Sequence, residues 1–155
     1  MRLYLVRHGE AHGKDVDPER GLTGKGRSDV ERVASFLASA GTSVSRIAHS
    51  GKKRAAQTAS ILASALGAEG AVEEASGLQP NDPVEPWAEE AGAWPDDVMI
   101  VGHLPFMDKL LSRLAAGNEA ASAARFEAGA AACLERDAKK GWILTSMVSP
   151  SLLRE

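Results

Sequence analysis

The chain is poor in cysteine, since Cys133 is the single cysteine among 155 residues. One cysteine cannot form an internal disulfide, and it cannot build a zinc site from several thiolates. Cys133 also cannot be the nucleophile of a Cys-x5-Arg phosphate loop, because Lys139 stands where that loop needs an arginine. We therefore expect Cys133 to be a small buried apolar side chain in a strand.

An excess of positive charge and long apolar runs are also missing. The formal net charge is −3, which gives no sign of the strongly basic face that nucleic-acid-binding proteins usually need. The apolar runs are too short to span a membrane, and the first residues lack the apolar segment of a secretory signal. We expect a cytoplasmic protein with no nucleic-acid or membrane partner, a single domain over residues 1–155, and favour a monomer.

The chain does contain short apolar runs that alternate with amphipathic segments. Residues 98–101 form a continuous apolar run typical of a central strand. Apolar side chains follow Thr23, a candidate helix N-cap, at helical spacing until Gly41. The expected strands are 2–6, 46–50, 71–75, 98–101, 131–136 and 142–148, and the expected helices lie within 23–41, 52–67 and 84–92 and after 105.

This alternation predicts an α/β fold, a single three-layer domain with a mainly parallel sheet and helices on both faces. The last two strands are close enough in sequence to form a hairpin, which allows an antiparallel edge.

Two of the expected strands end in histidine, at Arg7-His8-Gly9 and at Gly102-His103. A third strand leads into a helix that carries Arg54 in its first turn. If these strands are parallel, their carboxyl ends meet at one rim of the sheet, where ligands bind in open α/β folds. Arginine forks and helix N-termini at such a rim suit a phosphate group. Gly9 is expected to allow a sharp turn or a close approach to a ligand.

Four spaced motifs occur together: Arg7-His8-Gly9-Glu10, Leu22-Thr23-x-x-Gly26, Ser50 followed by Arg54-Ala55-x-Gln57-Thr58, and Gly102-His103-Leu104-Pro105. With these motifs, the chain resembles the histidine phosphatase superfamily, the phosphoglycerate mutase-like branch. The short length and the terminal Met147-Val148-Ser149-Pro150 make it most similar to SixA-type phosphohistidine phosphatases.

The resemblance implies a phosphoglycerate mutase-like fold and a role for each matching residue. His8 would be the nucleophile, which attacks phosphorus and gives a phosphohistidine intermediate. Arg7, Arg54 and His103 would bind the phosphoryl oxygens and stabilise charge in the transition state. Arg20, three residues before Thr23, would be a further phosphate contact or else an ordinary surface charge.

Simple chemistry supports these roles. A nucleophilic histidine must be neutral, and two adjacent arginines oppose its protonation. Phosphoryl transfer depends mainly on positioning and positive charge, which guanidinium groups can supply. We therefore expect no metal and no other cofactor. His12 and His49 are interpreted as ordinary loop and strand-end residues.

One departure from the larger family members concerns the leaving group. Those members carry a glutamate general acid after the third strand, whereas this chain has Gln79 near that position. A sugar or glycerate alkoxide needs such an acid, but an imidazole, whose conjugate acid has a pKa of about 6.5, leaves more easily. Asp82 or Glu85 could still supply the proton.

We therefore predict a phosphohistidine phosphatase whose substrate is a phosphohistidine-containing protein. One alternative is a broad small-molecule phosphomonoesterase that uses Asp82 or Glu85 as the acid. Another is a non-catalytic phosphoprotein-binding module, against which His8 argues because binding alone needs only the arginines.

Overall fold

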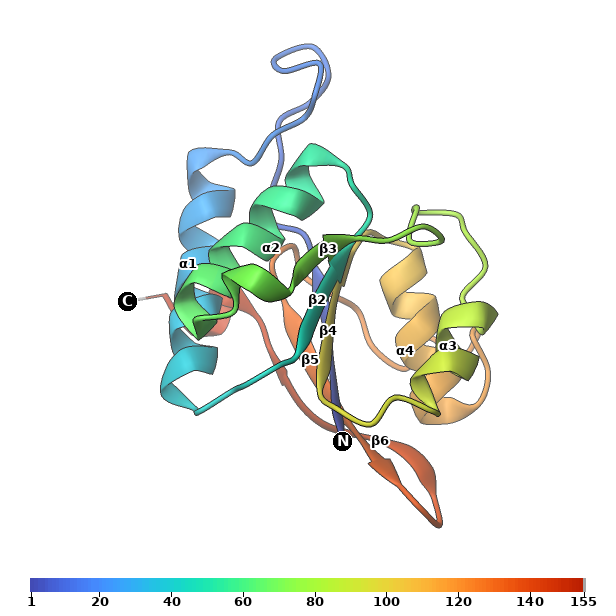
Figure 1. Ribbon diagram of the computed structural model, residues 1–155. Helices are drawn as coiled ribbons and strands as arrows, with labels where there is room; N and C mark the ends of the chain where they lie inside the picture. Colours follow the sequence, from blue (N-terminus) through green and yellow to red (C-terminus); the bar gives the residue numbers. More distant parts are fainter. Residues whose placement is uncertain (155) are drawn as a thin grey trace.

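The computed structural model describes residues 1–154, in which a six-stranded sheet forms the centre (Figure 1). The strand order is β3-β2-β4-β1-β5-β6. The strands β3, β2, β4 and β1 are parallel, while β5 pairs antiparallel with both β1 and β6. The strand bounds are Arg2–Arg7 (β1), Arg46–His49 (β2), Val72–Glu74 (β3), Val98–Gly102 (β4), Ala131–Asp137 (β5) and Gly141–Val148 (β6). The predicted α/β architecture and its antiparallel edge are confirmed.

Helices cover both faces of this sheet, as Figure 1 shows. One face carries α1 (Gly24–Ser39) and α2 (Lys53–Leu66), and the other carries α3 (Glu85–Ala91) and α4 (Phe106–Ala116). Short 3₁₀ turns follow α2 (η1, Glu69–Ala71) and close the described chain (η2, Pro150–Leu152). No helix within residues 1–154 is both long enough and apolar enough to cross a membrane.

Strand β1 shows why the sheet is covered on both sides. Its side chains alternate, so Leu3 and Leu5 pack with α3 and α4, while Tyr4 and Val6 pack with α1 and α2. All four are buried. This period of two is inherent in a strand, and apolar residues at every position therefore require a layer on each face. Cys133 lies buried in β5, as predicted.

Local signals define the ends of the helices. The Thr23 hydroxyl caps α1 by accepting a hydrogen bond from the Gly26 amide at 2.9 Å. Gly41 and Gly67 follow α1 and α2 with positive φ angles of 80° and 65°, the left-handed conformation that glycine adopts without strain. The segment between α4 and β5, which the sequence left without an assignment, is a connection that contains the buried Phe126.

Gly9 serves close packing against α1. A Cβ atom at Gly9 would lie 2.7 Å from Val30 Cγ2 and 3.0 Å from the Gly26 carbonyl oxygen. A Cβ atom at Gly26 would in turn collide with the Glu10 backbone. The two glycines thus let the chain after β1 cross the first turns of α1 at close range. The expectation that Gly9 makes room for a ligand or a sharp turn is replaced by this helix contact.

Candidate active site

The carboxyl ends of β1, β2 and β4 meet at one rim of the sheet. Arg7 pairs with Gly102 across β1 and β4, so His8 and His103 both leave the sheet at the same level. The His8 amide donates to the Gly102 carbonyl at 2.9 Å. The two imidazole centroids lie 5.0 Å apart, with an angle of 54° between the ring planes. The convergence expected from parallel strands is therefore present.

The half-buried His8 ring has a defined proton position. Its Nδ1 lies 2.7 Å from the Gly9 carbonyl oxygen. A carbonyl oxygen can only accept, so neutral His8 carries its proton on Nδ1 and keeps a free electron pair on Nε2. Burial lowers the pKa of His8 to about 4, the Gly9 hydrogen bond opposes that shift, and Arg54, Arg7 and Arg20 lower the pKa further. His8 is consequently neutral near pH 7.

Two arginines approach the rim with incomplete hydrogen bonding. Arg7 donates from Nη1 to the Phe126 carbonyl at 2.8 Å, but its Nε is buried without a partner. The Nε of Arg54 is also buried without a partner. Burial lowers the pKa of both guanidinium groups. An unpaired buried donor costs about 1–3 kcal/mol, and an acceptor that arrives there recovers that cost.

His103 is 1 % exposed, and its ring makes one side-chain hydrogen bond within residues 1–154. Its Nε2 lies 2.6 Å from Ser50 Oγ, which also accepts a hydrogen bond from the Lys52 amide at 3.4 Å. The buried Ser50 hydroxyl has no other acceptor among the hydrogen bonds of residues 1–154, so we assign its proton to the bond with Nε2, and this arrangement leaves the ring proton on Nδ1. Nδ1 is buried without a partner. Burial lowers the pKa of His103 to about 3, and His8, Arg54, Lys52 and Arg20 add to the shift.

The unpaired donors form a pattern. Within residues 1–154, the buried side-chain nitrogen and oxygen atoms without a hydrogen-bond partner are Arg7 Nε, Arg54 Nε and His103 Nδ1. All three are donors, and all three belong to the residues that the sequence grouped together. Native interiors leave few such groups unsatisfied. Their concentration beside the free Nε2 of His8 indicates a site for an anion with several oxygen atoms.

Arg20 lies within electrostatic reach of this site. It donates from Nε to the His12 carbonyl at 3.0 Å, and its backbone has a positive φ of 53°. Its charge contributes to the lowered pKa values of both histidines. Among the hydrogen bonds of residues 1–154, none joins Arg20 to His8. Arg20 is therefore near the site but is not hydrogen-bonded to His8.

Thr58 ties the site to α2. Its hydroxyl accepts from the Gly9 amide at 3.1 Å and donates to the Arg54 carbonyl at 2.8 Å. The neighbouring Gln57 accepts from the Leu22 amide at 2.8 Å. The sequence marked Gln57, Thr58 and Ser50 as motif residues but assigned no contact to any of them. Their position next to strand ends and Arg54 was the available signal.

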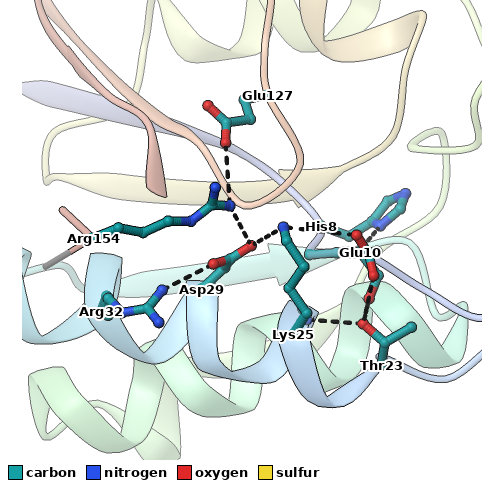
Figure 2. Close-up of polar contacts among 10 residues, drawn as sticks. His8, Glu10, Thr23, Lys25, Asp29, Arg32, Glu127 and Arg154 are labelled. Carbon is teal, nitrogen blue, oxygen red and sulfur yellow. Dashed lines mark hydrogen bonds and ion pairs between the residues drawn. The ribbon is translucent and has the colours of Figure 1, made fainter. Parts of the chain in front are cut away.

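A second network anchors the chain just after His8, as Figure 2 shows. Glu10 accepts a hydrogen bond from the Thr23 hydroxyl at 3.0 Å, and the Lys25 ammonium group lies 3.7 Å from the same carboxylate. Lys25 also contacts the buried Asp29 carboxylate at 2.8 Å. Arg32 and Arg154 complete the set of cations around Asp29. These contacts join the loop after β1 to the first turns of α1.

Gln79, which stands near the position of the missing acid, and the alternative acids Asp82 and Glu85 all have hydrogen-bond partners. Gln79 donates from Nε2 to the Ser50 carbonyl at 3.0 Å, and its backbone amide donates to Asp82 at 2.8 Å. Glu85 accepts two hydrogen bonds from Arg113, both at 2.8 Å. Gln79 therefore lies beside the site and supports Ser50, whereas Asp82 and Glu85 hold the surrounding loop and helix. Among residues 1–154, no group of three or more His, Cys, Asp or Glu side chains could hold a metal ion.

The chain matches a protein-family model and a curated relative. Residues 3–80, about half of the chain, match the model of the histidine phosphatase superfamily (branch 1). Over 101 residues the chain is 31% identical to the mitochondrial serine/threonine-protein phosphatase PGAM5 of Mus musculus. That match covers 61% of this chain and 35% of the mouse protein, so the chain spans about a third of that relative's length.

Solved structures share the whole fold. The protein histidine phosphatase SixA, solved in complex with tungstate, superposes with a TM-score of 0.88 at 24% identity, and the match covers 99% of this chain and 100% of SixA. The alpha-ribazole phosphatase of Shigella flexneri gives a TM-score of 0.76 at 19% identity and 97% coverage of both chains. The predicted resemblance is confirmed at the level of family and fold, while the named substrates of these neighbours differ.

Proposed function

This chain belongs to the histidine phosphatase superfamily, and on that basis we propose that it hydrolyses phosphohistidine carried on a protein. Its family and fold identify it as a phosphatase. The substrate proposal rests on one arrangement: the neutral His8 lies beside three unpaired buried donors, with Gln79 next to them. An alkoxide leaving group would need an acid at the position of Gln79.

In the proposed reaction, the electron pair on His8 Nε2 attacks the phosphorus atom of the substrate. The new N–P bond forms at Nε2 while the N–P bond to the substrate imidazole breaks. The substrate ring carries a proton on its other nitrogen, so it takes the bonding electron pair and leaves as neutral imidazole. Water then attacks the phosphorylated His8, and inorganic phosphate leaves as the Nε2 electron pair returns. The Gly9 carbonyl keeps the His8 proton on Nδ1 and holds the ring in place.

The phosphoryl oxygens would take the three free donors. Arg7 and Arg54 supply charged N–H groups, and His103 supplies a neutral one from Nδ1. Donors that are fixed before the reaction stabilise developing charge without reorganising, which is usually the largest contribution to catalysis. Because the bond made and the bond broken are both imidazole N–P bonds, transfer from phosphohistidine to His8 is nearly balanced in energy.

We expect the protein to release phosphate from a histidine-phosphorylated peptide throughout the range from about pH 5.5 to about pH 8. A pKa of about 4 keeps His8 neutral across that range. The fraction of His8 that can act as a nucleophile would fall only as the pH drops through this value. The measurement is phosphate release after subtraction of spontaneous hydrolysis. Absence of release at every pH would contradict the proposed function.

An NMR titration separates the enzyme from the ionisation of the substrate. The His8 ring signal, identified by its loss in His8→Ala, should titrate near pH 4. A midpoint at or above the usual value of about 6.5 would mean that His8 is partly cationic near neutral pH. That result would contradict the assignment of His8 as a neutral nucleophile. It would not contradict the proposed phosphatase function, which the phosphate-release measurement tests.

Ser50→Ala is expected to weaken oxyanion binding. Without the Ser50 hydroxyl, nothing holds the His103 proton on Nδ1, so this donor is lost in part of the molecules. The neutral Ser50–His103 hydrogen bond that favours this tautomer is worth about 0.5–1.5 kcal/mol, so kcat/KM and the affinity for tungstate should fall roughly 2- to 10-fold. Ser50→Thr keeps the hydroxyl and should restore most of both. Unchanged tungstate affinity in Ser50→Ala would refute the assigned tautomer.

A further inference from the structure

A depression of about 510 Å³ lies beside the candidate active site, between the loop before α1 and the start of α2. Its lining carries one acidic side chain, Glu19, and five basic ones. We call these five the basic rim: Lys14, Arg20, Lys52, Lys53 and Arg54. The depression is therefore locally positive, although the whole chain has a net charge of −3.

The loop side of the basic rim is held in a fixed shape. The Asp17 carboxylate accepts the backbone amides of Glu19 at 3.0 Å and Gly21 at 2.8 Å. Lys53 connects this loop to α2, because its ammonium group lies 3.3 Å from Glu19 and 3.8 Å from Asp17. Between these anchors, Arg20 adopts a left-handed backbone conformation that a side chain rarely takes. Such strain persists where surrounding contacts impose it, often at functional sites.

Two lysines of the basic rim have free charges. Lys14 and Lys52 are exposed, and neither has an ion pair within the part of the chain that the structure describes. Lys53, by contrast, is engaged by the loop. The charge of Lys52 also reaches the site, since it helps to lower the pKa of His103. An acidic group bound at Lys52 would therefore lie near the reacting phosphoryl group.

The basic rim is continuous with the active site. Arg20 and Arg54 line the depression and also act electrostatically on His8. Figure 1 shows the loop of residues 11–21 projecting past the first turn of α2, at the opposite end of the molecule from the β5–β6 hairpin. A small phosphate ester held at His8 would leave Lys14 and Lys52 unoccupied, whereas a protein surface could contact both.

We propose that Lys14 and Lys52 of the basic rim bind acidic side chains that flank the phosphohistidine on the substrate protein. This inference rests on the proposed function and adds the chemistry of the partner, a patch of Asp and Glu residues around the phosphorylated histidine. Charge complementarity of this kind speeds encounter and selects among partners more than it adds affinity. Each exposed ion pair contributes about 1.5- to 5-fold, and salt screens it.

The test uses two histidine-phosphorylated peptides that differ only in their flanking residues, four glutamates in one and four glutamines in the other. We expect the wild-type protein to favour the glutamate peptide about 5- to 10-fold in kcat/KM at low salt, and this ratio to approach one at about 0.5 M salt. Lys14→Glu/Lys52→Glu should remove or invert the ratio. The ratio within each variant cancels changes in overall activity.

Lys139→Glu/Lys140→Glu is the matched control, because it changes the net charge equally on the exposed β5–β6 hairpin. This variant should keep the wild-type ratio. Equal turnover of both peptides by the wild type at low salt would overturn the docking inference and leave the proposed function intact. A glutamate preference that survives in Lys14→Glu/Lys52→Glu would also overturn it. If neither peptide is hydrolysed, the proposed function itself fails, and the inference fails with it.

Discussion

His8→Ala is expected to lower phosphate release from a histidine-phosphorylated peptide by about 10⁴-fold or more, because removal of a nucleophile deletes the bond-forming atom. The fold should survive, since the His8 ring is half-buried and its side-chain hydrogen bond goes to the adjacent Gly9 carbonyl. The measurement is steady-state phosphate release, together with a melting curve to establish that the variant is folded.

The same variant tests the covalent intermediate. Wild-type protein mixed with a ³²P-labelled peptide should carry a transient label that is lost in acid and kept in base, and His8→Ala should carry none. His12→Ala is the matched control, because His12 lies in the loop and its hydrogen bond with Arg20 uses the backbone carbonyl, which the substitution keeps. It should label and turn over at nearly the wild-type rate. Steady turnover by folded His8→Ala would exclude the proposed mechanism.

The second large effect concerns the leaving group. We expect the wild-type protein to hydrolyse phosphohistidine about 10²- to 10⁴-fold faster than alkyl phosphates of similar affinity, because that is the contribution of a missing general acid. An alkoxide needs a proton as it leaves, whereas imidazole needs little help. Asp82 and Glu85, the alternative acids, are engaged by the Gln79 amide and by Arg113. Equal rates on both substrates would show that another acid is present.

Gln79→Glu should raise alkyl phosphate hydrolysis by about 10-fold or more and change phosphohistidine hydrolysis little. Gln79 donates to the Ser50 carbonyl, and a protonated glutamic acid can make the same hydrogen bond. That carbonyl disfavours the ionised carboxylate, so it raises the pKa of the introduced acid and helps it to keep a proton. The measurement is kcat/KM on both substrate classes.

Gln79→Met separates acid chemistry from support of Ser50. Methionine has similar length and no proton to give, so both rates should fall together as the Ser50 backbone loses its partner. A rise in alkyl phosphate hydrolysis with Gln79→Met would mean that polarity at this position, and not proton donation, controls the choice of substrate.

The amino-acid sequence by itself determined the positions of the elements and the rim at which the site forms. Alternating burial in β1, the Thr23 cap and the glycines at helix ends act over a few residues, so their effects can be recognised without the fold. The meeting of His8 and His103 also followed from sequence, because both residues end apolar strands and parallel strands bring those ends together.

The tertiary structure decided which groups are partners. Gly9 packs against Val30 and Gly26 of α1, and Ser50 meets His103 across 53 positions of sequence. Local patterns carry no information on such pairs, because each depends on how strands are ordered and how closely a helix approaches the sheet. The unpaired donors at Arg7, Arg54 and His103 can likewise be identified only in the folded structure. A donor is recognised as unpaired only when all the groups around it are known, and the sequence does not give those neighbours.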